Sequence, residues 1–310
     1  QCMRIQPPKS VYTHITATDL VCSTRGKWYA MEDSLSVPDG IAYPHFARKL
    51  CREIAPENYQ VPELCDNCGL DILLQQLYRD IMDDDPELEG GIVVLLSQGK
   101  QDLSYFELCY MAKLTGAVVA EAEQLIVMDN KVYYQAPEGG FQRVAIIHRL
   151  ALDSMLDPLC FDEDSPCGVP HLMEAYCAGH IAIINAPGCS LAEDRGLHYF
   201  IPAMIRYYLD EEPILPNVPT FVPWYPDQKK YVLEHMDSLI FKDVSSDRRA
   251  GAVYGDTLTT QEKRELTQRI IREPRRYIAQ SRIEVETQPV LAEDGVSTRQ
   301  AKCDFRAYTV

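Results

Sequence analysis

The sequence lacks a segment long and apolar enough to cross a membrane as a helix. Its apolar runs, such as Ile92–Leu96, are only as long as a strand, whereas a spanning helix needs about 20 apolar residues. No signal-peptide pattern precedes the first strand-like segment, and the chain begins with Gln1 instead of Met. We therefore expect a piece of a longer, soluble, cytoplasmic protein without a membrane partner.

Basic residues are scarce relative to acidic ones. The chain carries 30 Lys and Arg against 46 Asp and Glu, which gives a formal net charge of -16. A surface of this sign repels a polyanion on average, so nucleic acid is not an expected partner. A cationic substrate is compatible with this balance, but the balance does not require one.

Several catalytic and metal-binding motifs are missing. Of the eleven cysteines, only Cys65 and Cys68 form a C-x-x-C, and no second pair follows that could complete a zinc ribbon. No G-x-G-x-x-G follows a strand, and neither a serine nucleophile elbow nor H-E-x-x-H occurs. We expect reduced thiols that mostly pack in the interior. A dinucleotide-binding sheet, a serine hydrolase and a zinc protease are not favoured.

The middle of the chain alternates between strand and helix patterns. Short apolar runs at 91–97 and 117–121 enclose a helical pattern at 104–117, and a predicted hairpin turns at Asp129-Asn130. Further strands are expected at 141–149 and 180–188, with a helix at 170–179 between them. Strands that alternate with helices predict an α/β sheet covered on both faces.

The flanking regions differ from this middle part. The acidic run Asp83–Asp85 before Pro86 predicts a boundary, and the last third combines helices with strands in a mixed α+β pattern, with prolines at an exposed connection. We predict three parts, with residues 1–85 forming a hairpin segment, 86–188 an α/β lobe and 189–310 a second mixed lobe.

A predicted hairpin over His14–Leu35 places acids at strand positions. If it turns at Arg25-Gly26, Asp19 lies directly across from Glu32, and Ser34 follows on the same face. Two facing carboxylates repel each other, and a divalent cation with oxygen ligands would compensate. A one-residue shift in register would separate them. A magnesium site and a solvent-facing acidic pair both remain open from the hairpin alone.

Many ordered stretches along the chain resemble the circularly permuted ATP-grasp family, which includes glutathionylspermidine synthase-like ligases. The resemblance runs from about Tyr12 to near the C-terminus, and its main stretches are WYAMEDSLSVPDGIAY, SYFELCYMAKLTGA, GVPHLMEAYCAGHIAIINAPG, IPAMIRYYLDEEPILPNVPTF, LIFKDV and CDFRAY. It implies an α/β (α+β) ATP-grasp fold, circularly permuted, with a Rossmann-like middle lobe. It also implies ATP and Mg²⁺ as cofactors, with a small-molecule carboxylate and an amine as substrates; it predicts no oligomeric state.

The resemblance implies a metal site and a phosphate site. Asp19 and Glu32 take the magnesium-binding positions, and Ser34 stands where the family has Asn. Lys242 matches the strand lysine that contacts phosphate, although a salt bridge with Asp243 is the alternative. Arg195 matches a cation that binds phosphate, and Gln280 matches a residue near the base on an edge strand. Arg306 matches an arginine that stabilises phosphoryl charge, although a surface ion pair is the alternative.

The chain also departs from the family pattern. Gly251 is the only glycine in the loop DVSSDRRAGAV, where Arg248 and Arg249 replace flexible residues. Ser36 replaces a usual arginine, and Leu150 and Leu152 replace charged residues. Two hypotheses follow. One is an ATP-dependent carboxylate-amine ligase that acts through an acylphosphate. The other is a degenerate domain, a possible pseudoenzyme, that binds a nucleotide or a protein without catalysis.

Overall fold

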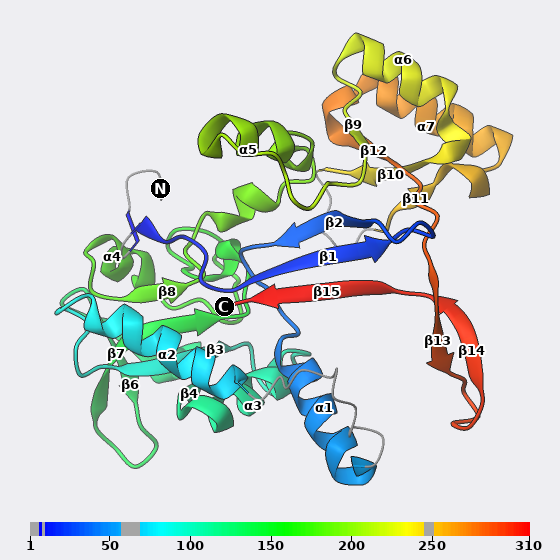
Figure 1. Ribbon diagram of the computed structural model, residues 1–310. Helices are drawn as coiled ribbons and strands as arrows, with labels where there is room; N and C mark the ends of the chain where they lie inside the picture. The colour runs from blue at the N-terminus through cyan, green and yellow to red at the C-terminus, as the bar shows by residue number, and fades with distance from the viewer. Residues whose placement is uncertain (1–5, 8–9, 57–68, 245–250) are drawn as a thin grey trace. The chain divides into compact units, whose positions relative to one another are not determined.

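The computed structural model describes residues 6–7, 10–56, 69–244 and 251–310 (Figure 1). It divides into two compact units, and the boundary between them falls inside three strands. The first unit comprises Gln1–Ala17, Ser34–Ser190 and Tyr308–Val310, and the second comprises Thr18–Asp33 and Leu191–Ala307. The predicted division at residues 85 and 188 stays a prediction. Cys65, Cys68, Arg248 and Arg249 lie outside the described residues.

The strands that cross the boundary form one three-stranded sheet in the order β15-β1-β2. Their bounds are Thr16–Cys22 for β1, Trp28–Ser34 for β2 and Asp304–Thr309 for β15. The two strands expected in the N-terminal hairpin are therefore confirmed.

The first unit contains the predicted alternation of strands and helices. Its elements are α1 (Ala42–Ile54), α2 (Leu70–Asp83), β3 (Ile92–Ser97), α3 (Tyr105–Thr115), β4 (Val118–Glu121), β5 (Leu125–Met128), β6 (Lys131–Gln135), β7 (Phe141–Arg149), α4 (Leu172–Cys177) and β8 (Ala182–Ile184). Strands β4, β3, β7 and β8 pair in parallel, and β5 and β6 extend the sheet by antiparallel pairing. Asp129 and Asn130 connect β5 to β6 with φ of 50° and 58°, as the predicted hairpin turn requires.

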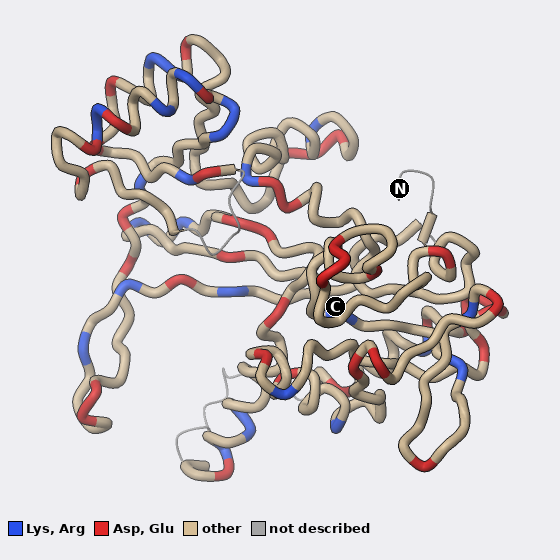
Figure 2. The backbone as a smooth tube through the Cα atoms, turned by 180° about the vertical axis from the view of Figure 1, so that it is seen from behind, with Lys and Arg blue, Asp and Glu red and all other residues tan. Residues whose placement is uncertain are grey.

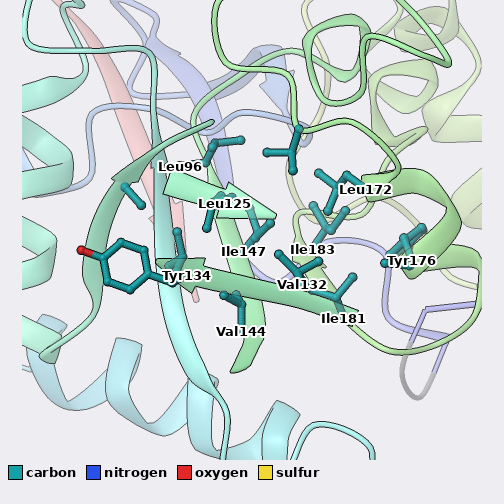
Figure 3. Packing of buried hydrophobic residues seen from close by; sticks show 14 of the residues in the cluster. Leu96, Leu125, Val132, Tyr134, Val144, Ile147, Leu172, Tyr176, Ile181 and Ile183 are labelled. Atoms are coloured by element: carbon teal, nitrogen blue, oxygen red, sulfur yellow. The ribbon is translucent and has the colours of Figure 1, made fainter. Parts of the chain in front are cut away.

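Alternating apolar side chains bury both faces of this sheet. In β3, Val94 and Leu96 join one core cluster while Leu95 joins the other. The first cluster packs against α4, and Figure 3 shows its side chains, among them Ile147 and Leu172, pointing toward one another. The second cluster packs against α2 and α3. The expectation of an α/β sheet covered on both faces is confirmed, because residues at period two alternate between the faces.

A polar pair lies inside the second cluster. The hydroxyl of Tyr78, on α2, and Nδ1 of His148, on β7, are 2.8 Å apart and form a buried hydrogen bond. Burial, together with the positive charge of Arg149, lowers the pKa of His148 from 6.5 to about 4. Burial likewise raises the pKa of Tyr78 well above its usual value. Both side chains are therefore neutral near pH 7.

We expect this histidine to make stability depend on pH. Below about pH 6.5 the unfolded chain binds a proton on His148, whereas the folded chain does so only near pH 4. The free energy of unfolding should therefore fall by about 2 to 3 kcal/mol between pH 6.5 and pH 4.5 from this group alone. Urea titrations should show that His148→Phe removes this part of the pH dependence, whereas replacing the exposed His235 with Phe leaves it intact. Equal pH dependence in wild type and His148→Phe would contradict the assignment.

The second unit carries the remaining helices and strands. They are α5 (Ile201–Leu209), β9 (Thr220–Phe221), α6 (Pro226–Glu234), β10 (Leu239–Asp243), β11 (Val253–Tyr254), α7 (Thr260–Arg272), β12 (Tyr277–Ser281), β13 (Thr287–Leu291) and β14 (Thr298–Lys302). Strands β11, β10, β12 and β9 form a sheet in that order, and β13 and β14 form a two-stranded sheet. The mixed α+β pattern predicted for this part of the sequence is confirmed.

Helices α6 and α7 cover one face of the four-stranded sheet (Figure 1). Phe241 of β10 and Ala279 of β12 point into the core with Leu266 of α7. The helix α7 begins with a capping box, in which Thr259 and Glu262 each bind the backbone N–H of the other. Alternation along β10 turns Lys242 away from this core, toward the opposite face of the sheet.

Acidic residues occur along much of the backbone and are not gathered in one segment (Figure 2). This distribution agrees with the acidic surface expected from the composition. Among the described residues, no helix combines the length and the apolar character that crossing a membrane requires.

Candidate functional site

A narrow pocket in the second unit gathers charged and apolar side chains from distant parts of the sequence. It lies between the end of β2, the segment 192–201, and the face of β10 and β12 opposite the helices. Its lining residues are Met31, Glu32, Asp33, Ala192, Glu193, Asp194, Arg195, His198, Ile201, Lys242, Ile278 and Gln280.

Antiparallel pairing builds one wall of this pocket. Lys242 lies opposite Ile278, and Ile240 lies opposite Gln280. Because side chains at i and i+2 share a face, Lys242, Ile278 and Gln280 point to the same side of the sheet. The buried Gln280 amide donates to Thr220 Oγ1 at 3.2 Å, which fixes its orientation.

Glu32 binds two cations in the pocket. Its carboxylate accepts hydrogen bonds from Lys242 Nζ at 3.1 Å and from Arg195 Nε at 3.2 Å. Burial alone would raise the pKa of Glu32, but the charges of Lys242 and Arg195 outweigh it and hold that pKa below its usual value. The Glu32 carboxylate is therefore charged near pH 7 and lies between two basic side chains, in a pocket whose lining also includes Asp33, Glu193 and Asp194.

The predicted alternative for Lys242, a salt bridge with Asp243, is not the arrangement that the structure describes. Lys242 binds Glu32, while the Asp243 carboxylate accepts from Arg276 Nε at 2.7 Å. Adjacent residues of β10 face opposite sides, which separates the two side chains.

Asp19 and Arg306 pair with each other. Arg306 donates from Nε to Asp19 Oδ1 at 2.7 Å and from Nη2 to Asp19 Oδ2 at 2.9 Å, which is a two-point contact between planar groups. Neither residue lines the pocket around Glu32. The surface ion pair that sequence reasoning kept as the alternative for Arg306 is thus present. Whether this arginine also contacts a phosphoryl group stays a prediction.

The hairpin between β1 and β2 differs from the predicted two-residue turn. Ser23 N donates to Lys27 O at 2.9 Å, so three residues lie inside the closing hydrogen bond, and Gly26 adopts a φ of +72°. A glycine in the left-handed region is typical of a three-residue loop with a bulge. Further along, Thr18 Oγ1 donates to Asp33 Oδ1 at 2.7 Å, a pair that lies one step from Asp19 and Glu32.

The strand that carries Gln280 is not an edge strand, which corrects that prediction. Strand β12 lies between β10 and β9, and Gln280 pairs with Ile240 on one side and Thr220 on the other. The strand β9 has only two residues, too few for its sequence pattern to reveal it. The backbone N–H groups of Ser281 and Arg282 are also bound, to Pro219 O and Ser238 O.

Sequence reasoning missed two pocket residues, Asp33 and His198. Strict alternation along β2 would place Asp33 on the face opposite Glu32, yet both residues line the pocket. His198 lies in a short 3-10 helix, Leu197–Tyr199, which has no periodic signal. Ser34 is buried at the end of β2, and its predicted role as a metal ligand stays a prediction.

The donor chemistry near Glu32 suits a hard cation. Carboxylate oxygens come from Glu32 and Asp33 in the pocket and from Asp19 on the neighbouring strand β1. Within the described ranges, no group of three or more His, Cys, Asp or Glu side chains is arranged to hold a metal ion. Mg²⁺ commonly takes one or two protein carboxylates together with substrate phosphates.

Comparisons with known proteins give one family and several relatives. The model of the family described as "Circularly permuted ATP-grasp type 2" matches residues 1–310. An uncharacterized protein of Synechocystis sp. is 36% identical over 308 residues, which cover 99% of this chain and 63% of the relative. A Frankia casuarinae protein named "Putative glutamate--cysteine ligase 2-2" is 31% identical over 284 residues, 91% of this chain and 32% of that protein. The chain thus spans less than two thirds of either relative.

A solved structure shares the fold. The apo form of a glutathione synthetase-like effector from Globodera pallida matches with a TM-score of 0.60 over 96% of this chain and 68% of that chain. The sequences are 10% identical, so this likeness concerns the fold alone.

Proposed function

Because the chain belongs to the circularly permuted ATP-grasp family, type 2, we propose that it is the nucleotide-binding part of an ATP-dependent ligase that joins a carboxylate to an amine. The relative named as a glutamate–cysteine ligase supports this class of reaction. The sequence-based identification of the family and its fold is confirmed by the match over residues 1–310.

One observation carries the proposal: Lys242 and Arg195 both bind the carboxylate of Glu32 within one pocket. Lys242 and Arg195 lie within hydrogen-bonding distance of Glu32, with side chains only 12% and 10% exposed. A partly buried pair of cations suits the phosphates of ATP, since electrostatic attraction strengthens away from bulk water. The retained charges favour a ligand-binding site over a degenerate one.

The proposed chemistry has two steps. A carboxylate oxygen of the substrate attacks the γ-phosphorus of ATP, the bond to the bridging oxygen breaks, and ADP leaves. The amine nitrogen then attacks the acyl carbon of the resulting acylphosphate, inorganic phosphate departs, and the nitrogen loses a proton. Lys242 and Arg195 would bind phosphate oxygens and offset the charge on the transferring group, with Arg306 as a further candidate for that role. Catalysis would come from positioning and charge neutralisation.

Magnesium fits the oxygen donors of this region, and Asp19, Glu32 and the Ser34 hydroxyl are the proposed ligands. Asp33, which lines the pocket beside Glu32, is a further candidate. Bound magnesium would neutralise part of the phosphate charge. Glu32 pairs with Arg195 and Lys242, and Asp19 pairs with Arg306. Magnesium binding would therefore replace these basic partners of the two carboxylates with the metal ion.

Calorimetric titration with ATP, in the presence and absence of MgCl₂, tests the proposal. The wild-type chain should bind ATP only with magnesium, and the Asp19→Ala, Glu32→Ala double variant should lose this binding. ADP release in the presence of a panel of amino acids and short peptides would then identify the substrates.

A matched control removes two other acids of the second unit. Asp237 and Asp256 each form an ion pair on the surface, with Lys263 and Arg282. The Asp237→Ala, Asp256→Ala variant should bind ATP as the wild type does. Failure of the folded wild-type chain to bind ATP, or undiminished binding by the Asp19, Glu32 variant, would overturn the proposal.

A further inference from the structure

One ring nitrogen in the pocket has an unsatisfied hydrogen-bonding capacity. His198 is 6% exposed and lines the pocket with Glu32 and Lys242. Its Nε2 atom is buried and has no hydrogen-bond partner among the residues that the structure describes. A buried polar atom without a partner costs free energy, commonly about 1–3 kcal/mol, so a group that binds it gains more than the same contact would at the surface.

The backbone around this histidine is held in place. His198 N donates to Asp194 O at 3.2 Å, and the Asn217 side chain donates to His198 O at 2.9 Å. Asn217 in turn lies in a segment bound to β2, because Ala30 N donates to Pro216 O and Val218 N donates to Ala30 O. The backbone that carries the imidazole is therefore held on both sides, which limits where the ring can lie.

The ring suits an uncharged partner. Burial lowers the pKa of His198, which favours the neutral imidazole near pH 7. Neutral imidazole has one nitrogen that accepts a hydrogen bond and one that donates. The phosphates of a nucleotide find cations in Lys242 and Arg195, so the neutral ring is better matched to the base.

The apolar members of the pocket lining agree with a planar base. Met31, Ile201 and Ile278 contribute apolar surface, and Ile201 follows His198 by three residues. The backbone of β12 at Gln280 is paired on both sides, and the N–H groups of Ser281 and Arg282 are bound within the protein. These two N–H groups are thus not available to a base, which leaves a role for a side chain of the pocket in distinguishing one base from another.

We propose that Nε2 of His198 accepts a hydrogen bond from the exocyclic amino group of adenine and so gives the pocket its preference for ATP over a nucleotide with a 6-oxo base. This inference rests on the proposed function, since it concerns the base of the nucleotide that the pocket would bind. It names a specificity-determining residue that the sequence pattern did not reveal.

Calorimetric titration with ATP and with ITP, both with MgCl₂, tests the inference on the whole chain. ITP carries an oxygen where ATP carries the amino group. The wild type should bind ATP about tenfold more tightly than ITP, the size of one well-formed hydrogen bond in a buried site. His198→Phe keeps a ring but removes the acceptor, and it should weaken ATP binding about tenfold with little change for ITP.

Two further variants separate recognition from packing. His198→Gln places an amide oxygen near the former Nε2 position and should retain most of the preference for ATP. Ile201→Val removes one methylene group from the same pocket and should change the affinities for ATP and ITP by the same factor. Equal losses for both nucleotides in His198→Phe would overturn the base-reading role while leaving the proposed function intact.

A ligand-side test does not depend on the folding of any variant. Purine riboside triphosphate lacks the amino group, and the wild type should bind it about tenfold more weakly than ATP. Equal affinity for these two nucleotides would overturn the inference, as would equal affinity for ATP and ITP. Absence of any nucleotide binding by the folded wild type would overturn the proposed function and the inference with it.

Discussion

Lys242→Met is expected to weaken the binding of magnesium–ATP by about 10- to 100-fold. The lysine is the pocket cation on β10, and its Nζ lies 3.1 Å from Glu32 Oε2. A charge-assisted hydrogen bond to a phosphate is worth about 1.5–3 kcal/mol, which corresponds to this range of affinity. Methionine preserves most of the length of the side chain, so the loss reports on charge more than on packing.

Arg276, which binds the residue next to Lys242, offers a matched control. Arg276 pairs with Asp243, the residue after Lys242, and does not line the pocket. Arg276→Met also removes one positive charge from the second unit, and it should change ATP affinity less than twofold. Both variants are measured by calorimetry at one salt concentration, because distant charges are screened while close contacts are screened less. Equal losses in the two variants would mean that Lys242 acts only through the overall charge.

The second large effect is on stability. Arg149→Met should lower the free energy of unfolding by about 3–5 kcal/mol, because it leaves one carboxylate and three backbone carbonyl groups without their buried cation. The Arg149 side chain is fully buried, and it donates to Asn185 O at 3.1 Å, to Ala151 O at 2.6 Å and to Asp153 Oδ1 at 2.5 Å. The arginine thus connects the end of β7 to the segments that follow β7 and β8.

Urea unfolding at pH 7 measures this effect. Arg79 on α2 is an exposed arginine that donates to Gln75 O, and Arg79→Met serves as the control. The control should shift the free energy of unfolding by less than about 0.5 kcal/mol, as surface substitutions usually do. A loss below about 1 kcal/mol for Arg149→Met would show that the cluster relaxes around the missing cation.

The parts of the fold that the sequence predicted well are those with a clear period. Phe141–Arg149 was expected as a strand and forms β7 with those bounds, because its residues are apolar and β-branched over a strand-sized run. The helix expected over residues 259–273 forms as α7, and the structure shows that Thr259 and Glu262 make a capping box at its start.

The errors came from short elements and from tertiary pairing. The prolines within residues 204–221 were expected to mark an exposed connection, yet Val218 is buried and Thr220 pairs with Gln280. Two-residue strands carry no periodicity, so their pairing, and with it the interior place of β12, could not be predicted. His198 escaped notice for a similar reason, because the significance of one histidine depends on which atoms surround it in three dimensions.

Glu32 and Lys242 were selected through the family resemblance, and the structure brings them together. Sequence spacing could not have paired residues 210 positions apart, whereas the resemblance assigned Glu32 to a metal ion and Lys242 to a phosphate of one nucleotide site. Their contact with each other was not expected, since each was assigned to a separate partner, a metal ion and a phosphate. In the structure the two side chains of opposite charge form a hydrogen bond with each other.

The segment Pro216–Phe221 supports three walls of the pocket at once. Its backbone pairs with Ala30 on β2, Asn217 holds the carbonyl group of His198, and Thr220 pairs with Gln280 on β12. Pro216 and Pro219 restrict the backbone conformations of this stretch in the unfolded chain. Ordering it therefore costs less conformational entropy than ordering a flexible loop of equal length. The same restricted stretch therefore sets the distances between β2, His198 and β12, the three walls of the pocket.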